Sequence, residues 1–477
     1  MSLIFRRTFL QVCLASLSMA FSAASSAQDW FEDFKDQASA EDLHQFLYAM
    51  PKGGDLHNHI TGAVLSEWAY ELALAQAARG YTYYTKQRIN NCPSGIGDGR
   101  RTPYLLMHQT VDHLAYAALD SCEQEEYVAL DALNEQQLER WKNSIRLDKP
   151  FEGRDEFFET HWNRLGSLTR NPYLVAEFLV RNMQSFGAEG LLYMEPQVPI
   201  FGMIEANGDT LSSDQVVALY GARLAEKDAQ ATGVEVRLQL ALLRFLPNAE
   251  QALEALYKIA HAHDLIVAVN MVGREDNDKG YPLRFLDTLR KLRRTHSGVR
   301  LSIHAGEVDE PNFHIRDTLL LGAERIGHGI NLITDADTLR QMRYGPYMVE
   351  INLVSNLLLE YVDDYSQHPF PEYLRLGVPV ALSTDDRGMW DSIMTDEFFV
   401  AVTEFDLSWE EVKLLSRNSL RYSFLDEDTK ARLMKEYDQR IARFTKQVER
   451  RGQAAVADVK APRLGFICRQ YQLCPDA

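Results

Sequence analysis

The chain has 477 residues and a formal net charge of −18, from 50 basic and 68 acidic residues. This excess of negative charge disfavours binding to nucleic-acid phosphates or anionic lipid headgroups, and it favours a small neutral or cationic ligand. The 46% hydrophobic content is enough for the core of a globular protein, either one large domain with insertions or a few smaller domains.

The first 27 residues have the three parts of a signal peptide. A short basic start, MSLIFRR, precedes an apolar stretch and then the small residues SAASSA, which end at Ala27. The apolar stretch is short and contains serines, which favours cleavage over a permanent membrane anchor. The run RRTFLQ also resembles a twin-arginine export signal, so an ordinary secretory route and a twin-arginine route both stay open. We therefore expect a periplasmic or secreted protein with no membrane contact after cleavage.

Four cysteines remain after residue 27, and an even number in an exported chain suggests disulfides. Of the three ways to pair them, Cys92 with Cys122 and Cys468 with Cys474 closes the shortest loops. The chain has no CxxC pair, which disfavours a zinc site built from cysteines.

The remaining chain divides into four stretches. Residues 28–49 have an amphipathic helical pattern, and a short strand is expected around His57. Residues from about 80 to 156 show no strand pattern and look like an insertion, partly helical. Beyond it, short apolar strands alternate with amphipathic helices up to residue 424, and residues 425–477 form a charged helical tail. The expected later strands are 190–198, 235–245, 265–273, 299–307, 325–330, 347–356 and 379–386.

Eight strands separated by helices predict an α/β fold, most naturally a (β/α)8 TIM-type barrel over residues 50–424. A doubly wound open sheet is the alternative. It is less favoured because no glycine-rich phosphate loop follows the first strand.

Polar residues recur where the predicted strands end, which is where a barrel of this type places its active site. They are His57 and His59 on the first strand, His304 and Glu307 on the fifth, His328 on the sixth, and Asp385 and Asp386 on the eighth. One such histidine is more often structural than functional, but four polar strand ends at one level are hard to explain that way.

The spacing of His57 and His59 predicts a metal site. Residues at i and i+2 of a strand point to the same side, so both imidazoles can bind one ion. His304 and Asp385 would complete a site of three nitrogens and one oxygen, which suits a catalytic Zn²⁺ with room for water. The other nine histidines fall in predicted helices or loops, where we expect surface positions. They are His44, His108, His113, His161, His261, His263, His296, His314 and His368.

The motifs MPKGGDLHNH, HAGE, RIGHG and STDD, in this order, resemble those of the adenosine deaminase family within the metal-dependent amidohydrolases. The signal peptide, the MPKG run and the long insertion resemble its secreted, growth-factor-like branch. Related barrel hydrolases with two metals usually carry a modified lysine on the fourth strand. LIVAVNMVG has none, so one Zn²⁺ per chain is expected.

The resemblance implies a role for each residue. His57, His59, His304 and Asp385 would hold Zn²⁺, and the ion would lower the pKa of a bound water. His328 would orient that water and take its proton, and Glu307 would protonate the purine ring, provided that burial raises its pKa. Asp386 and the backbone amide of Gly273 would bind the ring, and adenosine would become inosine and ammonia. For Asp386 a helix N-cap, and for Gly273 a turn glycine, are the structural alternatives.

One position departs from the family pattern. Where the family often has an aspartate for the sugar 5′-hydroxyl, this chain has Thr61, and a neutral hydroxyl binds more weakly than a carboxylate. A 5′-modified adenosine or another adenine-containing molecule therefore stays open as substrate. Trp162 is a candidate contact for the ribose and equally a core residue.

Three functions remain in view at this point. The first is an exported adenosine deaminase that binds a purine nucleoside. The second is another mononuclear zinc amidohydrolase that acts on a modified adenine or a different amine or amide. The third is a catalytically silent binding or signalling protein, which the complete set of ligands and acids disfavours. The extra helices, by resemblance to secreted relatives, suggest a homodimer.

Overall fold

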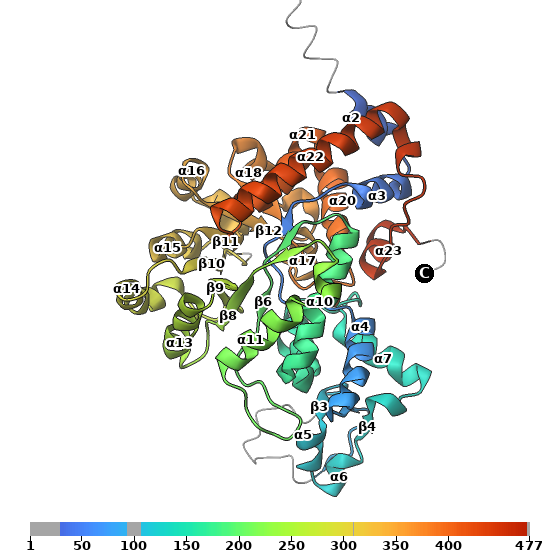
Figure 1. The fold of residues 1–477 in the computed structure, drawn as a ribbon, viewed down its shortest axis with the longest axis vertical. Coiled ribbons are helices and arrows are strands. Elements are labelled where there is room, and N and C mark those ends of the chain that lie inside the picture. The colour runs from blue at the N-terminus through green and yellow to red at the C-terminus, as the bar shows by residue number, and fades with distance from the viewer. Residues whose placement is uncertain (1–28, 93–105, 309, 475–477) are drawn as a thin grey trace, which may run out of the picture.

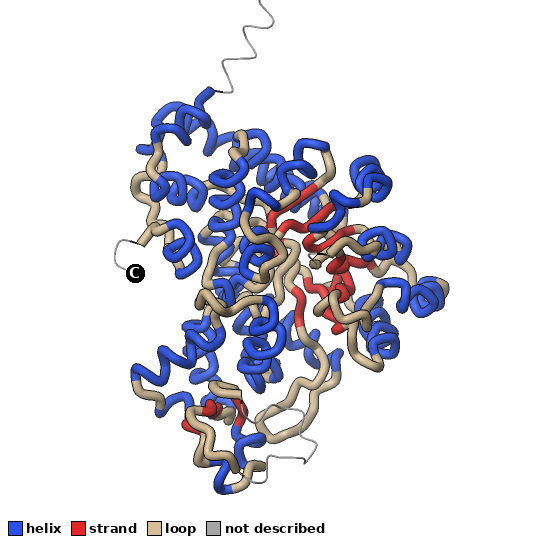
Figure 2. The backbone as a smooth tube through the Cα atoms, turned by 180° about the vertical axis from the view of Figure 1, so that it is seen from behind, coloured by secondary structure: helices blue, strands red, loops and turns tan. Residues whose placement is uncertain are grey.

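The computed structural model describes residues 29–92, 106–308 and 310–474, so the predicted signal peptide, residues 1–27, lies outside the described residues. Short parallel strands occupy the centre of the molecule and helices surround them (Figures 1 and 2). The central strands are β1 (Gly54–Asp55), β5 (Tyr193–Met194), β6 (Gln197–Val198), β7 (Glu235–Val236), β8 (Leu238–Leu243), β9 (Ile266–Val272), β10 (Arg300–Ala305), β11 (Arg325–His328), β12 (Met348–Ile351) and β13 (Val380–Leu382).

The strands pair in the order of the chain. One sheet runs β6-β8-β9-β10-β11-β12-β13, and a second runs β1-β5-β7, all parallel. The segment after β1 joins the two ends of the seven-stranded sheet. Asn58 forms a β-bridge to Asp385, just after β13, and His59 forms one to Gln197 in β6. A doubly wound sheet would reverse its strand order at a switch point, whereas this order runs around a ring. The (β/α)8 prediction is therefore confirmed.

Several strand boundaries differ from the predicted ones. The expected strands at 190–198 and 235–245 are each divided in two, as β5 and β6 and as β7 and β8. The strand predicted at 347–356 stops at Ile351, because the next residues turn into a short helix that begins at Leu353. Strands of the ring are short because each contributes only a few residues to the barrel wall before its loop begins.

Amphipathic helices cover the outside of the ring (Figure 1). Their N-termini are often capped by side chains: Ser212 opens one helix with a capping box, and Asn171 caps another that has Pro172 at its first position. These helices are α10 (Pro172–Ala188), α11 (Ser213–Leu224), α12 (Lys227–Gln230), α13 (Ala249–Ala262), α14 (Leu286–Arg293), α15 (His314–Leu321), α16 (Ala336–Tyr344), α17 (Leu353–Leu358), α18 (Phe370–Leu376), α19 (Arg387–Trp390), α20 (Met394–Phe405) and α21 (Trp409–Arg421).

The insertion contains strands that the sequence pattern did not predict. A small antiparallel sheet has the order β3-β2-β4, and its strands are only three or four residues long, too short for an alternating pattern to stand out. The disulfide Cys92–Cys122 lies beside it, as expected. The elements of the insertion and of the segments on either side of it are α4 (Ser66–Ala75), β2 (Tyr83–Lys86), β3 (Thr110–Asp112), α5 (His113–Ala117), α6 (Ser121–Gln124), β4 (Tyr127–Ala129), α7 (Glu135–Ile145), α8 (Arg154–Glu156), a π-helical turn (Phe157–His161) and α9 (Trp162–Leu165).

Helices from both ends of the chain pack together on one side of the barrel (Figure 1). They are α2 (Asp29–Gln37), α3 (Ala40–Ala49), α22 (Glu427–Arg451) and α23 (Gly465–Tyr471). Aromatic rings join them, with Trp30 centred 5.4 Å from Trp409 and Phe46 centred 5.2 Å from Phe444. The second expected disulfide, Cys468–Cys474, closes the last loop. Among the described residues, no helix combines the length and apolar character that crossing a bilayer requires.

Candidate active site

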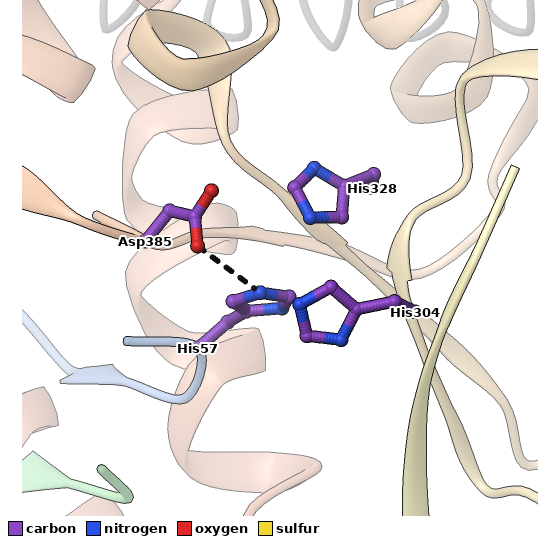
Figure 3. A group of neighbouring side chains, drawn as sticks. All are labelled: His57, His304, His328 and Asp385. Atoms are coloured by element: carbon purple, nitrogen blue, oxygen red, sulfur yellow. Dashed lines mark ion pairs between the residues drawn. The ribbon is translucent and has the colours of Figure 1, made fainter. Parts of the chain in front are cut away.

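The polar strand ends singled out by the sequence come together at one end of the barrel. The backbone around β1 hydrogen-bonds to the end of β13, where the Asp385 N–H donates to the His57 carbonyl at 2.8 Å. Side chains of His57, His304, His328 and Asp385 converge from four different strands (Figure 3). All four are buried, and one ligand atom from each lies within 4.8 Å of the others.

His57 is held so that one ring nitrogen faces this centre. Its Nδ1 donates to Glu350 Oε2 at 2.8 Å, so in the neutral ring Nε2 carries the lone pair. Glu350 is itself anchored by the hydroxyl of Ser302 at 2.9 Å and by Arg325 Nε at 2.6 Å. A side chain at Gly327 would place its Cβ 2.6 Å from the His57 ring, so glycine leaves the room this ring needs.

His304 is oriented in the same way by a chain of amides. Gln239 Oε1 accepts from the Asn270 side-chain amide at 3.2 Å, which turns Asn270 Oδ1 toward His304. His304 Nδ1 lies 2.9 Å from that oxygen and must donate to it, so Nε2 again carries the lone pair. Carbonyl or carboxylate partners of this kind are typical behind metal-binding histidines.

His59, the remaining predicted ligand, lies beside these four side chains, and its ligand atom groups with those of Asp385 and Asp386. His59 Nε2 lies 3.2 Å from His304 Nε2 and 3.3 Å from Asp385 Oδ1. The other Asp385 oxygen accepts from the Ser355 hydroxyl at 2.7 Å. Burial raises the pKa of Asp385, but hydrogen bonds from His57 and His59 outweigh it and hold the pKa well below the usual value. The carboxylate is therefore ionised.

This donor set fits a metal cation. His57 Nε2 is buried and accepts no hydrogen bond from the part of the chain that the structure describes, although Asp385 Oδ1 lies 3.5 Å away. Burial lowers the pKa of His57, but the carboxylates of Asp385 and Glu350 raise it to about 10, so this position favours positive charge. Three imidazoles and one carboxylate are the ligands expected for catalytic Zn²⁺.

Two acidic groups beside the donor set have pKa values raised well above the usual range. Burial, followed by the charges of Asp385 and Glu275, raises the pKa of Glu307 well above its usual value. Burial and the neighbouring Asp385 and Glu307 do the same for Asp386, whose Oδ1 is buried without a hydrogen-bond partner among the described residues. Glu307 Oε1 lies 3.7 Å from His328 Nε2. The site thus offers two carboxylic acids within reach of one another and of the donor set.

The predicted substrate-binding residues lie around this centre. Thr61 is buried in the turn that follows His59, and Gly273 ends β9 with φ +93°, a conformation that favours glycine. The Trp162 ring is centred 6.1 Å from that of His59 and 6.0 Å from that of Phe157. Trp162 therefore connects the segment that follows the insertion to the metal side of the site.

Glu275 is a site residue that the sequence reasoning missed. It is buried after β9 and its two oxygens accept the backbone N–H groups of Glu307 at 3.0 Å and Gly306 at 3.2 Å. His314 Nδ1 lies 2.6 Å from the same carboxylate. Glu275 thus holds the turn that presents Glu307. One feature of the sequence could have revealed Glu275: it is a carboxylate two residues after Gly273, the glycine that follows β9.

Three histidines expected at the surface are buried instead. His44 pairs with Asp396 at 2.8 Å, and His161 Nε2 lies 3.0 Å from the Arg146 carbonyl. His368 lies 3.0 Å from Asn356 near the site. Helix and loop positions in the sequence did not reveal these partners, which come from distant segments.

Comparison with known proteins identifies the family. The family model described as adenosine deaminase matches residues 125–440, more than half of the chain. An adenine deaminase from Aspergillus fumigatus is 26% identical over 84% of this chain and 98% of its own length. An adenosine deaminase from Clostridium acetobutylicum is 28% identical over 63% of this chain and 87% of its own.

Solved structures share the fold. An adenine deaminase from Arthrobacter aurescens has a TM-score of 0.61 at 21% identity and covers 83% of this chain and 100% of its own. An amidohydrolase from Burkholderia ambifaria, solved with bound zinc, has a TM-score of 0.59 at 18% identity, over 84% of this chain and 94% of its own. The chain therefore belongs to the adenosine deaminase family, whose members are hydrolytic deaminases that act on C–N bonds.

Proposed function

We propose that this protein deaminates an adenine-type substrate by hydrolysis, with adenosine as the first candidate, and releases ammonia. The observation that carries the proposal is the buried Glu307, whose pKa is raised well above its usual value, beside three histidines and an aspartate whose pKa is lowered. Family membership supports it, because relatives along most of the chain are adenine and adenosine deaminases.

The residues divide the reaction between them. Glu307 donates its proton to the ring nitrogen beside the carbon that carries the amino group, which makes that carbon a better electrophile. Asp386 binds the ring through its unpartnered oxygen, and the Gly273 backbone N–H contacts a second ring nitrogen. The oxygen of water forms a bond to the ring carbon and the carbon–amino bond breaks. One proton of that water restores Glu307, and the other goes to the amino group, which leaves as ammonia.

We propose one Zn²⁺ per chain, held by His57, His59, His304 and Asp385. When bound, the ion supplies a water of lowered pKa at neutral pH. The backing of His57 by Glu350 and of His304 by Asn270 keeps both Nε2 atoms ready to bind a cation. The zinc in the related amidohydrolase structure is consistent with this assignment.

Free adenine, or an adenosine altered at the 5′ position, is the second candidate substrate. Thr61 supplies a neutral hydroxyl where a carboxylate would bind the sugar most strongly. The relative matched along 98% of its own length is called an adenine deaminase. A zinc amidohydrolase acting on a different amine would release no ammonia from any of the adenine compounds assayed below.

We also propose that the protein works outside the cytoplasm, in the periplasm or after secretion. The signal-peptide pattern of residues 1–27 and two disulfides in the described chain support this location, because disulfides persist in oxidising compartments. Membership of the secreted, growth-factor-like branch is part of the same proposal.

A direct assay tests the function. Ammonia release and the ultraviolet change of the purine are followed for adenosine, 2′-deoxyadenosine, 5′-deoxyadenosine and adenine, before and after chelation and again with zinc restored. We expect turnover of at least one of them, lost on chelation and recovered with zinc. Equal activity on adenosine and 5′-deoxyadenosine would indicate that the 5′-hydroxyl is not used. No ammonia from any adenine compound by the zinc-restored protein would overturn the proposal in favour of a silent binding protein.

A further inference from the structure

His328 is connected to a buried chain of hydrogen bonds that ends at a backbone amide. The N–H of Phe370 donates to His368 Nδ1 at 3.1 Å. His368 Nε2 lies 3.0 Å from Asn356 Oδ1, and Asn356 Nδ2 lies 3.0 Å from His328 Nδ1. His328, Asn356 and His368 are each at most 2% exposed, so water does not compete for these bonds.

The direction of each bond follows from the first one. A backbone N–H only donates, so His368 Nδ1 must accept from Phe370. Burial lowers the pKa of His368 to about 3, so its ring is neutral and has one donor and one acceptor. Because Nδ1 is the acceptor, Nε2 carries the proton and donates to Asn356.

The orientation of the Asn356 side-chain amide determines which nitrogen of His328 carries the proton. Its atom facing His368 receives a hydrogen bond, so that atom is the oxygen, and the amide nitrogen faces His328. The nitrogen donates, so His328 Nδ1 is an acceptor, and a neutral His328 ring carries its proton on Nε2. Asn352 Nδ2 also lies 3.3 Å from His328 Nδ1 and 3.5 Å from His328 Nε2, but Asn352 Oδ1 has no partner among the described residues to fix the orientation of this amide.

We propose that Asn356 and His368 are positioning residues that hold His328 in the Nε2–H tautomer, opposite to the tautomer of His57 and His304. The three rings then differ in function although their ligand atoms cluster. His57 and His304 present lone pairs, whereas His328 presents a proton toward Glu307, 3.7 Å away. A protonated Nε2 has no lone pair for a metal ion, so His328 is not a metal ligand through this atom. His59 then supplies the third imidazole of the ligand set.

The consequence for catalysis rests on the proposed function. A His328 that carries Nε2–H donates a hydrogen bond to the attacking oxygen and orients it. It does not take the proton of that water at the start of the reaction, which is the role that the family resemblance implied. A donor here also stabilises negative charge that develops on the oxygen as its bond to the ring carbon forms.

The tautomer is tested by nitrogen NMR on protein labelled with ¹⁵N-histidine and purified with its metal. The His328→Gln variant assigns the His328 signals by their absence. We expect a pyridine-type Nδ1 and a pyrrole-type Nε2 for His328. A pyrrole-type Nδ1 would overturn the proposal whether or not the protein turns over any purine, so this result is separate from the proposed function.

Variants of the chain test the positioning role. Asn356→Asp replaces the amide donor by a carboxylate oxygen of the same shape, which should draw the His328 proton to Nδ1. We expect kcat to fall on the order of a hundredfold, with KM and metal content little changed. His368→Gln, which keeps an N–H donor, should retain more kcat than His368→Leu. An unchanged kcat and an unchanged His328 spectrum in a folded Asn356→Asp protein would contradict the assignment. If Asn356→Asp does not fold, the spectrum of the parent decides.

Discussion

The metal side and the rim of the site are built differently. On the metal side, His57 and His304 come from barrel strands, and each ring has a second polar partner that fixes which nitrogen faces the centre. At the rim, Thr61 lies in a turn and Trp162 lies in the segment that follows the insertion, where it is positioned by contacts between rings. The barrel thus fixes the chemistry, and the loops and insertion are free to set the substrate.

The largest difference should follow from removing a metal ligand. His304→Ala deletes a nitrogen from the donor set and leaves Asn270 without its partner, so we expect loss of bound metal and of turnover. Metal analysis of the purified protein beside an ammonia assay checks this. The rim variant Trp162→Leu is the matched control and should keep its metal. Full metal occupancy in His304→Ala would remove His304 from the ligand set.

Weakening the hydrogen-bond acceptor behind His57 should lower metal affinity less than removing a ligand does. Glu350→Gln weakens the acceptor for His57 Nδ1–H, and we expect metal affinity to fall about 10- to 100-fold. Competition with a chelator measures it. Phe424→Leu is the control, because the Phe424 ring is centred 3.8 Å from the Arg325 guanidinium and belongs to neither chain of partners behind His57 and His304. Equal weakening by both variants would mean that Arg325, and not the carboxylate on His57, governs affinity.

A change in the turn that positions Glu307 should have a smaller effect, and it should act on kcat. Glu275→Gln puts an amide donor against backbone N–H groups that need acceptors, so Glu307 shifts. We expect kcat to fall about tenfold with metal content and KM nearly unchanged. Asp276→Asn, next in the chain but paired with Arg274, serves as control. A change confined to thermal stability would show that Glu275 is only structural.

The rim should give the smallest effect and the one that depends most on the substrate. Thr61→Asp supplies a carboxylate for the sugar hydroxyl, and a charged hydrogen bond predicts a gain in kcat/KM for adenosine of about tenfold. Adenine and 5′-deoxyadenosine, which lack that hydroxyl, are the controls and should gain nothing. An equal gain for all three substrates would place Thr61 away from the sugar.

The convergence of the polar strand ends could be predicted because it follows a simple geometric rule. The ends of parallel strands meet at one face of a barrel, so motifs far apart in the sequence, such as those of His57, His304 and Asp385, were expected to lie close together. The fold followed from the same regular alternation of strands and helices. The two disulfides followed from loop length.

The supporting residues could not be predicted because their signal is a contact and not a pattern. Glu350 and Asn270 are single polar residues inside apolar strands, and only the side-chain contacts in the structure show that they meet His57 and His304. His368 and Asn356 are twelve residues apart in the sequence. Their hydrogen bonds, to each other and from Asn356 to His328, form only after a helix and a turn have folded. The insertion sheet was missed because its strands are too short to show alternation.

One measurement tests the central claim, that Glu307 is the acid of a metal-dependent deaminase. Glu307→Gln removes the proton donor while leaving every proposed ligand in place. Metal content and ammonia release from the best adenine substrate are measured on the same preparation. We predict near-normal metal with turnover reduced by about 10²- to 10⁴-fold. Turnover near the parent level, or loss of metal equal to that of His304→Ala, would contradict the account.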